Sequence, residues 1–247
     1  MKHKYYFIQI VRQLIEFILE LVYPGRCPVC DEPVKQFGTL ICPGCRGKMQ
    51  YIKAPRCFRC GKSLKQEDKE YCHDCSRLSH GFDQGRALFT YRSVADSIFR
   101  FKYMNRREYS RYFGTEIADK LGDVIKKWEP DALVPVPLHP SRKRKRGYNQ
   151  AELLADVIGS KMSIPVQKGW IVRTRRTTPQ KELSALERQN NLKRAFKIRL
   201  HDVKLNTIII IDDIYTTGST VDAMSAVMRE NGVQRIYFIT LAMGTGI

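Results

Sequence analysis

The strongest apolar signal in the chain is a run of four isoleucines at 208–211. Side chains of a strand point alternately to opposite faces, so an unbroken apolar run predicts a strand that is buried on both faces, as in a parallel sheet. Residues 221–231 then carry apolar side chains at a helical spacing and end at Asn231-Gly232. The apolar run 235–241 predicts the next strand. This order of strand, helix and strand indicates an α/β fold.

The same kind of pattern extends upstream over most of the chain. We predict strands at 81–91, 131–138 and 164–172, and helices at 93–107, 109–127 and 151–159. The segment 173–196 follows a predicted strand and is long, polar and basic. A long connection without regular periodicity is usually functional or disordered, so we expect it to take part in function.

Residues 1–23 carry apolar side chains at a helical spacing, which predicts an amphipathic helix. Arg12, Glu16 and Glu20 interrupt it, so no apolar run reaches the ~20 residues that a membrane span needs. No small-residue cleavage site follows, and a signal peptide is therefore not expected. We predict three parts, namely the N-terminal helix at 1–25, a cysteine-rich part at 26–80 and the α/β domain at 81–247.

Charge adds a further constraint, because the chain is strongly basic. It holds 43 Lys and Arg against 25 Asp and Glu, with a net charge of +18 and a pI near 9.7. Nucleic acid or phosphorylated substrates are the natural partners of such a chain. Five consecutive cations at 142–146 repel one another, which favours a polyanion at this segment over simple solvation. Lys102 and Arg106 could reach an anion, but we favour the interpretation of each as a solvated charge.

All eight cysteines lie at 27–75, in four Cys-x-x-Cys pairs with eleven residues between each pair and the next. Two such pairs can surround one metal ion with four thiolates, so the spacing predicts two structural Zn²⁺ sites in a duplicated unit. Sequential pairing is the simplest arrangement, and an interleaved one stays open. A disulfide framework is the alternative, but no export signal accompanies it. The predicted ligands are Cys27, Cys30, Cys42 and Cys45 for one ion and Cys57, Cys60, Cys72 and Cys75 for the other, with His73 a bystander.

The end of the isoleucine strand carries the candidate chemistry. Two carboxylates, Asp212 and Asp213, follow the strand, and a loop of small hydroxyl residues leads into the next helix. A helix N-terminus offers unpaired backbone N–H groups to an anion, and glycine allows a close backbone approach. Carboxylates beside it suit sugar hydroxyls or a hydrated Mg²⁺. The pattern therefore predicts a site for a phosphorylated sugar, with the loop made of Thr216, Thr217, Gly218, Ser219 and Thr220.

This stretch resembles the 5-phosphoribosyl-1-pyrophosphate (PRPP) loop of type I phosphoribosyltransferases. The resemblance implies that Asp212 and Asp213 bind the ribose hydroxyls, that the Thr/Gly/Ser loop binds the 5-phosphate, and that Mg²⁺ enters with PRPP. It also implies that a basic loop meets the pyrophosphate, for which Arg142 and Arg146 are the candidates, and that a mobile segment at 173–196 covers the site.

Several motifs in order give a closer resemblance to the ComF family. They are the Cys-x-x-Cys ribbons, Pro-Val-Pro-Leu-His at 135–139, Arg-Gly-Tyr-Asn-Gln at 146–150, the residues Gln180, Leu183, Arg188, Asn191, Ala195 and Phe196, and the acidic loop. The resemblance implies a double zinc ribbon ahead of a phosphoribosyltransferase fold. It further implies a cytoplasmic protein of natural competence that handles incoming single-stranded DNA, with other DNA-uptake proteins as possible partners.

One position departs from the purine-salvage relatives. Those enzymes carry an Asp in the loop where this chain has Thr216, and a Thr is a poor general base. Purine salvage is therefore disfavoured, and no catalytic base is assigned. Three functions stay open: a PRPP-dependent enzyme, a DNA-binding protein that uses the fold for binding alone, and an adaptor whose ribbons present the aromatic residues Tyr51, Phe58 and Tyr71. Those aromatic residues could equally form the small core of the ribbons.

Overall fold

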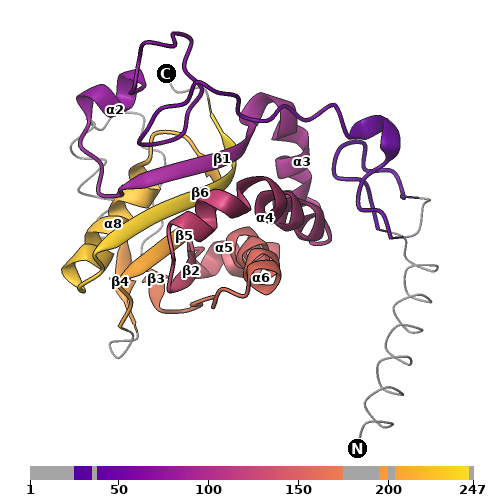
Figure 1. The fold of residues 1–247 in the computed structure, drawn as a ribbon. Helices are drawn as coiled ribbons and strands as arrows, with labels where there is room; N and C mark the ends of the chain where they lie inside the picture. The colour runs from indigo at the N-terminus through magenta and orange to yellow at the C-terminus, as the bar shows by residue number, and fades with distance from the viewer. Residues whose placement is uncertain (1–24, 35–37, 175–194, 200–203, 245–247) are drawn as a thin grey trace, which may run out of the picture.

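The structure is a computed structural model that describes residues 25–34, 38–174, 195–199 and 204–244 (Figure 1). Within these ranges no helix is long and apolar enough to cross a membrane. The predicted amphipathic helix at 1–23 lies outside the described residues.

A four-stranded parallel sheet forms the centre of the molecule, in the order β1-β6-β5-β2. The strands are β1 (Gln84–Thr90), β2 (Ala132–Pro135), β5 (Thr207–Tyr215) and β6 (Arg235–Met243). β5 is an inner strand, and its isoleucines pair in register with both neighbours: Ile208 lies opposite Ala132 on one side and Ile236 on the other. An inner position with helices on both faces explains why this strand is apolar without alternation.

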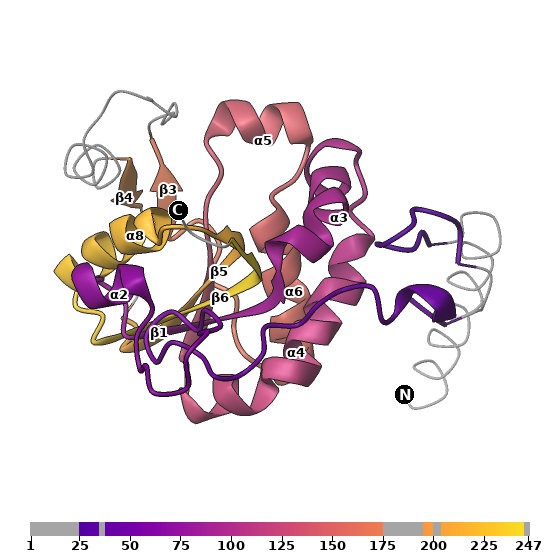
Figure 2. The same cartoon turned by 90° about the horizontal axis from the view of Figure 1, so that it is seen from above.

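Helices cover both faces of the sheet (Figures 1 and 2). One core packs Ile209 and Ile211 against α3 (Tyr91–Tyr103), α4 (Tyr109–Lys127) and α6 (Gln150–Met162). The opposite core packs Ile208 and Ile210 against α8 (Ser219–Glu230). The isoleucine run therefore supplies two separate hydrophobic cores, one on each side of the sheet.

The strand and helix predictions are confirmed for most of the domain, with three differences. β5 does not end at the acidic pair but continues to Tyr215. The strand predicted at 164–172 is reduced to β3 (Ile171–Arg173), and only a single bridge at Val166 reaches β2. Pro165 has no N–H to extend that bridge into a ladder.

The third difference is at the basic segment, which forms a short helix, α5 (Pro140–Arg146), rather than a turn. His139 caps it through an Nδ1 that accepts from the Ser141 N–H, and Gly147 ends it in a left-handed conformation. Pro140 stands in the first helical turn, where its missing N–H costs nothing. These start and stop signals make the helix although its cations repel one another.

A two-stranded antiparallel pair stands apart from the main sheet. β3 pairs with β4 (Phe196–Ile198), and Thr174 N–H donates to the Ala195 carbonyl at 2.8 Å just beyond the pair. Residues 175–194 lie between the two strands, so most of the segment predicted to cover the site lies outside the described residues. The residues on either side of it, Thr174 and Ala195, are joined by this hydrogen bond.

The cysteine-rich part forms two small units, ribbon 1 (26–49) and ribbon 2 (56–77), which contain the 3-10 helix η1 (Pro43–Cys45) and α2 (His73–Arg77). Ribbon 1 contributes to the core on the α3, α4 and α6 side, and ribbon 2 to the core on the α8 side. The link between them runs antiparallel along β1, where Ile52 N–H donates to Leu88 and Thr90 N–H donates to Gln50. The link thus covers the edge strand of the sheet, which would otherwise be free to pair with another chain.

Candidate functional site

The predicted phosphate loop lies at the carboxyl end of β5, where the strand passes into α8. Gly218 caps the N-terminus of α8 with φ of +82°. A small pocket at this point is lined by Asp212, Ile214, Tyr215, Thr216, Gly218, Ser219, Thr220 and Val221. The loop hydroxyls and the first N–H groups of an N-terminus with no side-chain cap therefore border one cavity, which is the geometry of an anion site.

Gly218 is required here for two reasons. Its positive φ strains any residue with a Cβ, and a Cβ at this position would lie 2.6 Å from Tyr215 Oη. Tyr215 itself is fixed, because its ring stacks on Phe238 with centroids 4.6 Å apart. The close approach of the loop to the β5 strand end therefore depends on glycine.

The acidic pair lies beside this loop, and its two carboxylates have different surroundings. The Asp213 N–H donates to Asp212 Oδ1 at 2.8 Å, while Asp213 Oδ2 forms an ion pair with Lys102 Nζ at 2.9 Å. Burial, and after it the charge of Asp213, raise the pKa of Asp212 to about 7, although Lys102 and Arg173 act in the opposite direction. Holding two carboxylates this close to each other costs the fold stability, as is common at functional sites.

Two arginines from different elements lie near each other, and one of them acts on the acidic pair. Burial lowers the pKa of Arg173, at the end of β3, and the charge of Arg142 on α5 lowers it further, whereas Asp212 acts in the opposite direction. Arg173 is thus within electrostatic reach of both Arg142 and Asp212. Arg142 has no ion-pair partner among the described residues, so its charge is available to a ligand.

Arg146, the second predicted pyrophosphate residue, is engaged elsewhere. Its guanidinium lies 4.9 Å from the centroid of the Tyr103 ring and donates to Gln150 Oε1 at 3.0 Å. The two arginines of α5 therefore differ: Arg142 lies within electrostatic reach of Arg173, whereas Arg146 is turned toward α3.

Sequence reasoning missed Lys102 and Arg173 as site residues. The interpretation of Lys102 as a solvated charge is wrong, because it pairs with Asp213. Arg173 was grouped with the long polar segment, whose composition gave no reason to single it out. Only the fold brings these cations to the carboxylates, since each is separated from them by many residues and belongs to another element.

The cysteines gather into two groups, each with its four sulfurs within 4.8 Å of one another. The groups are Cys27, Cys30, Cys42 and Cys45, and Cys57, Cys60, Cys72 and Cys75. Sequential pairing is thus the arrangement found. Within the groups, Cys30 and Cys42 sulfurs are 3.4 Å apart and those of Cys60 and Cys72 3.6 Å apart. The edge of a tetrahedron with Zn–S bonds of about 2.3 Å is about 3.8 Å, so both groups fit a structural zinc ion.

His73 lies outside the second cysteine group, with its ring largely exposed next to Asp74, and the prediction that it is a bystander is confirmed. Ribbon 2 is tied to the α/β domain by Gly61, whose Cβ would lie 2.6 Å from the Gly85 carbonyl oxygen. The Gly85 N–H in turn donates to the Arg59 carbonyl at 2.7 Å. Backbone thus packs directly on backbone where the ribbon meets β1.

Ribbon 1 is held by an ion pair with the start of α4. Asp31 accepts from Arg106 Nε at 2.7 Å and from its Nη2 at 2.8 Å, and Tyr109 Oη donates to the same carboxylate at 2.6 Å. Arg106 is therefore not a solvated charge, as the sequence suggested, but joins the two parts of the chain.

Comparison with known proteins supports the two-part organisation. A family model described as "Double zinc ribbon domain" matches residues 18–76, and one described as "Phosphoribosyl transferase domain" matches residues 110–245. "Competence protein F" of Haemophilus influenzae is 30% identical over 223 residues, which cover 88% of this chain and 96% of that protein. This chain belongs to the ComF family.

Other relatives of this ComF chain carry related names. "Competence protein ComFC" of Bacillus subtilis is 28% identical and covers 83% of this chain and 89% of its own length. "DNA utilization protein YhgH" of Escherichia coli K12 is 29% identical, with 88% and 90% covered. Among solved structures, a purine phosphoribosyltransferase from Pyrococcus horikoshii Ot3 matches 53% of this chain and 74% of its own, with 20% identity and a TM-score of 0.34. The predicted fold class, a type I phosphoribosyltransferase domain behind a double zinc ribbon, is confirmed.

Proposed function

We propose that this ComF chain binds PRPP together with Mg²⁺ at the end of β5, and that it acts in natural competence on incoming single-stranded DNA in the cytoplasm. The observation that carries the PRPP site is the pocket that Asp212 shares with four loop residues, Thr216, Gly218, Ser219 and Thr220. The role in competence is supported by the names of the relatives, "Competence protein F" and "Competence protein ComFC".

In this proposal each group of PRPP has a counterpart in the site. The ribose hydroxyls donate to Asp212 and Asp213, which can only accept when ionised. The 5-phosphate accepts from the hydroxyls of the loop and from the first N–H groups of α8, whose positive dipole end favours the anion. Arg142, and Arg173 at the end of β3, meet the pyrophosphate. Mg²⁺ would enter with the pyrophosphate oxygens and neutralise part of their charge.

The same arrangement suits the displacement of pyrophosphate from C1 of the ribose. The C1–O bond to pyrophosphate breaks as the acceptor's nucleophile forms its bond, and the two arginines stabilise the leaving group. Thr216 cannot remove a proton from the acceptor efficiently. The acceptor in this scheme therefore carries a nucleophile that needs no strong base from the loop.

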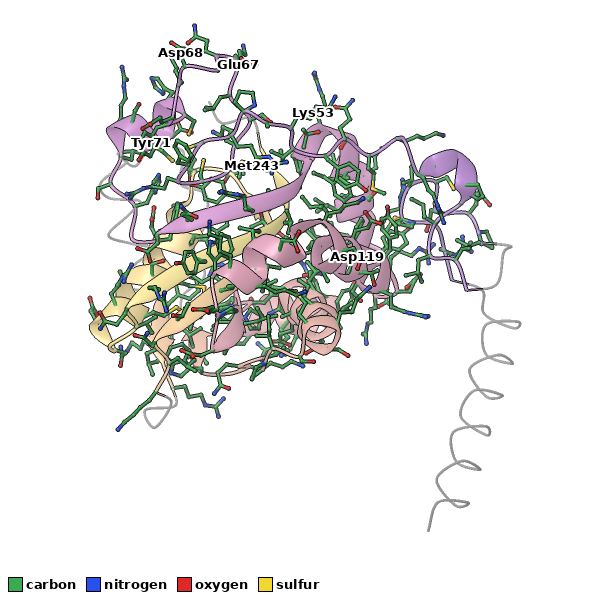
Figure 3. The ribbon with its side chains drawn as sticks, viewed as in Figure 1. Lys53, Glu67, Asp68, Tyr71, Asp119 and Met243 are labelled. Atoms are coloured by element: carbon green, nitrogen blue, oxygen red, sulfur yellow. The ribbon has the colours of Figure 1, made fainter. Side chains whose placement is uncertain are left out.

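Calorimetric titration of zinc-replete protein with PRPP, with and without Mg²⁺, tests the site. We expect Mg²⁺-dependent binding to the native chain and none to the double variant Asp212→Asn with Asp213→Asn. Asp119→Asn is the matched control, since Asp119 is a half-exposed carboxylate of α4 that pairs with Lys161 away from the pocket (Figure 3). Equal affinity in the double variant and in the control would overturn the assignment.

A second candidate function is nucleic-acid binding without turnover, favoured by the net charge of +18. It predicts an affinity for single strands that falls steeply with salt. A chain that binds single strands but shows no Mg²⁺-dependent PRPP binding would establish this function in place of the first.

A further inference from the structure

Large apolar side chains are exposed at two places among the described residues. Ribbon 2 and its exit present Phe58, Tyr71 and Leu78, whereas α3 and the residue after it present Tyr91, Phe99, Tyr103 and Met104. Three of the α3 side chains, Phe99, Tyr103 and Met104, are about half or more exposed, at 56%, 60% and 48%. Because these side chains lie mostly outside the core, packing within the fold does not explain why large apolar residues stand at these positions.

The aromatic rings of Phe99 and Tyr103, at the end of α3, pack against each other and form an exposed surface that we call the shelf. The centroids of Phe99 and Tyr103 are 5.1 Å apart. The guanidinium of Arg146 lies over the Tyr103 ring at 4.9 Å and also donates to Tyr103 Oη at 3.2 Å. Gln150 accepts from the other side of the same guanidinium and fixes its position. Arg146 thus orients Tyr103, whose side chain nevertheless remains largely exposed to solvent.

Cations surround this shelf. α5, which carries Arg146, presents exposed Lys143, Arg144 and Lys145, and it lies next to the end of α3 (Figure 2). Arg107, also exposed, lies 4.8 Å from the centroid of Tyr148. The nearby carboxylates are Asp96 on α3, Glu108, whose charge acts on Tyr148, and Glu152, which pairs with Lys143. Positive charge therefore outweighs negative charge beside the exposed rings.

We infer that this α3–α5 surface, made of Phe99, Tyr103, Arg107 and residues 143–146, binds single-stranded nucleic acid. Aromatic faces on which unpaired bases stack, next to cations that follow the phosphates, are what single-strand binding requires. The inference rests on the nucleic-acid partner of the proposed function and assigns a place to it. A duplex keeps its bases stacked on one another, so the shelf discriminates against it.

The surface borders the proposed ribose site. Lys102 precedes Tyr103 in α3, and its side chain reaches Asp213 at 2.9 Å. Arg142 belongs to the same helix as Arg146 and lies within electrostatic reach of Arg173, whose charge acts on Asp212. Helix α3 thus reaches the acidic pair directly through Lys102, and α5 lies near it through Arg142 and Arg173. A strand bound on the shelf is adjacent to the place where PRPP would react.

Fluorescence anisotropy with a labelled oligo-dT strand tests the inference on the full, zinc-replete chain. We expect Phe99→Ala and Tyr103→Ala each to weaken binding by roughly 5- to 150-fold, the range for losing one stacked base. The variant Arg144→Gln with Lys145→Gln should weaken binding of all sequences and reduce the slope of log affinity against log salt by about 1 to 2.

Matched controls come from ribbon 2. Phe58 and Tyr71 are similarly exposed and lie edge to face with centroids 6.4 Å apart, but Glu67, Asp68 and Glu70 are near Tyr71 in the chain (Figure 3). Phe58→Ala and Tyr71→Ala should leave the affinity for the strand unchanged. Unchanged binding by the α3 variants, or an equal loss in the ribbon variants, would overturn the inference.

PRPP calorimetry on Tyr103→Ala separates this inference from the proposed function. Strand binding lost with PRPP binding retained supports the α3–α5 surface independently of the sugar-phosphate site. Absence of PRPP binding in the native chain, with strand binding still dependent on Tyr103, refutes the PRPP site and leaves the surface supported. Strand binding that is absent from the native chain, or that equals binding of a duplex of the same sequence, refutes the surface.

Discussion

Asp212 and Asp213 are adjacent in the chain, yet the fold treats them differently. Asp213 has a cation beside it in Lys102, whereas Asp212 accepts a backbone N–H and is raised in pKa to about 7 by burial and by its neighbour. A carboxylate retained in such a place lowers stability in the absence of a ligand. The usual reason for that cost is function.

A pH series measures this cost. The raised pKa of Asp212 means that its contribution to stability is present at low pH and is lost as pH rises from its unfolded value of about 4 to about 7. Asp212→Asn does not titrate, so we expect it to be more stable than the native chain by up to about 4 kcal/mol at pH 8 and by much less at pH 4. Thermal unfolding across this range checks the trend. Asp119→Asn is the control, and a stability gap that did not change with pH would contradict the assignment.

Gly218 gives a second test at the scale of one residue. Gly218→Ala adds a Cβ at a positive φ and only 2.6 Å from Tyr215 Oη, so we expect a loss of about 2–4 kcal/mol and weaker PRPP binding. Gly169→Ala is the matched control, because Gly169 has φ of +73° and no heavy atom within 4 Å of its Cβ. That variant should lose only about 1–2 kcal/mol. Denaturant unfolding compares them, and equal losses would show that the contact with Tyr215 is unimportant.

At the scale of elements, the sequence pattern was sufficient to predict those strands, helices and metal sites that depend on one segment of the chain. The isoleucine run predicted β5, the apolar spacing after it predicted α8, and the four Cys-x-x-Cys pairs predicted two metal sites. The limits of β5 were not predictable, because Asp212 and Asp213 are poor strand residues and only pairing with β6 carries the ladder on to Tyr215.

Ion pairs between different elements could not be predicted from the local sequence pattern. Lys102 with Asp213 and Arg106 with Asp31 join residues far apart in the chain, and a single cation in a helix or in the loop after it carries no sign of its partner. The three aromatic residues proposed as a contact face or as the core of the ribbons lie in different surroundings. Phe58 and Tyr71 are exposed, as a contact face requires, whereas Tyr51 donates to Glu116 and packs on Phe89 in the body of the domain.

Zinc content tests the two ribbons as elements. We expect two zinc ions per chain, held by the two cysteine groups. The variant Cys30→Ser with Cys42→Ser removes two ligands from one group and should retain one ion. Cys30→Ser with Cys60→Ser takes one ligand from each group and should retain none after dialysis against a chelator. Atomic absorption gives the counts, and the reverse order would indicate interleaved pairing.

At the scale of the whole molecule, each ribbon is part of a core of the α/β domain rather than an appendage. Ribbon 1 shares the core of α3, α4 and α6, and ribbon 2 shares the core of α8. His80, after ribbon 2, places Nδ1 2.9 Å from Asp222 Oδ2 in the first turns of α8. The metal sites are therefore mechanically linked to both faces of the sheet and, through α8, to the phosphate loop.

The link between ribbon 1 and α4 can be measured by a double-mutant cycle with Asp31→Asn and Arg106→Gln. We expect a coupling of about 1–2 kcal/mol from the paired hydrogen bonds. Burial opposes ionisation of Asp31, but the hydrogen bonds from Arg106 and Tyr109 outweigh it and lower the pKa of Asp31. The coupling is therefore present above about pH 4 and is lost as pH falls below it. A coupling of zero at pH 7 would show that the ribbon is held by packing alone.

The strand order has a consequence for how the chain is made. β1 is the first strand to be synthesised, and its neighbour in the sheet is β6, the last. On the ribosome, β1 and the link that covers it have to wait for almost the whole chain before the sheet can form, which gives the fold many contacts between distant residues and slows its folding. Zinc binding to the ribbons needs only residues that precede the sheet in the chain, and it gives the emerging chain an ordered beginning.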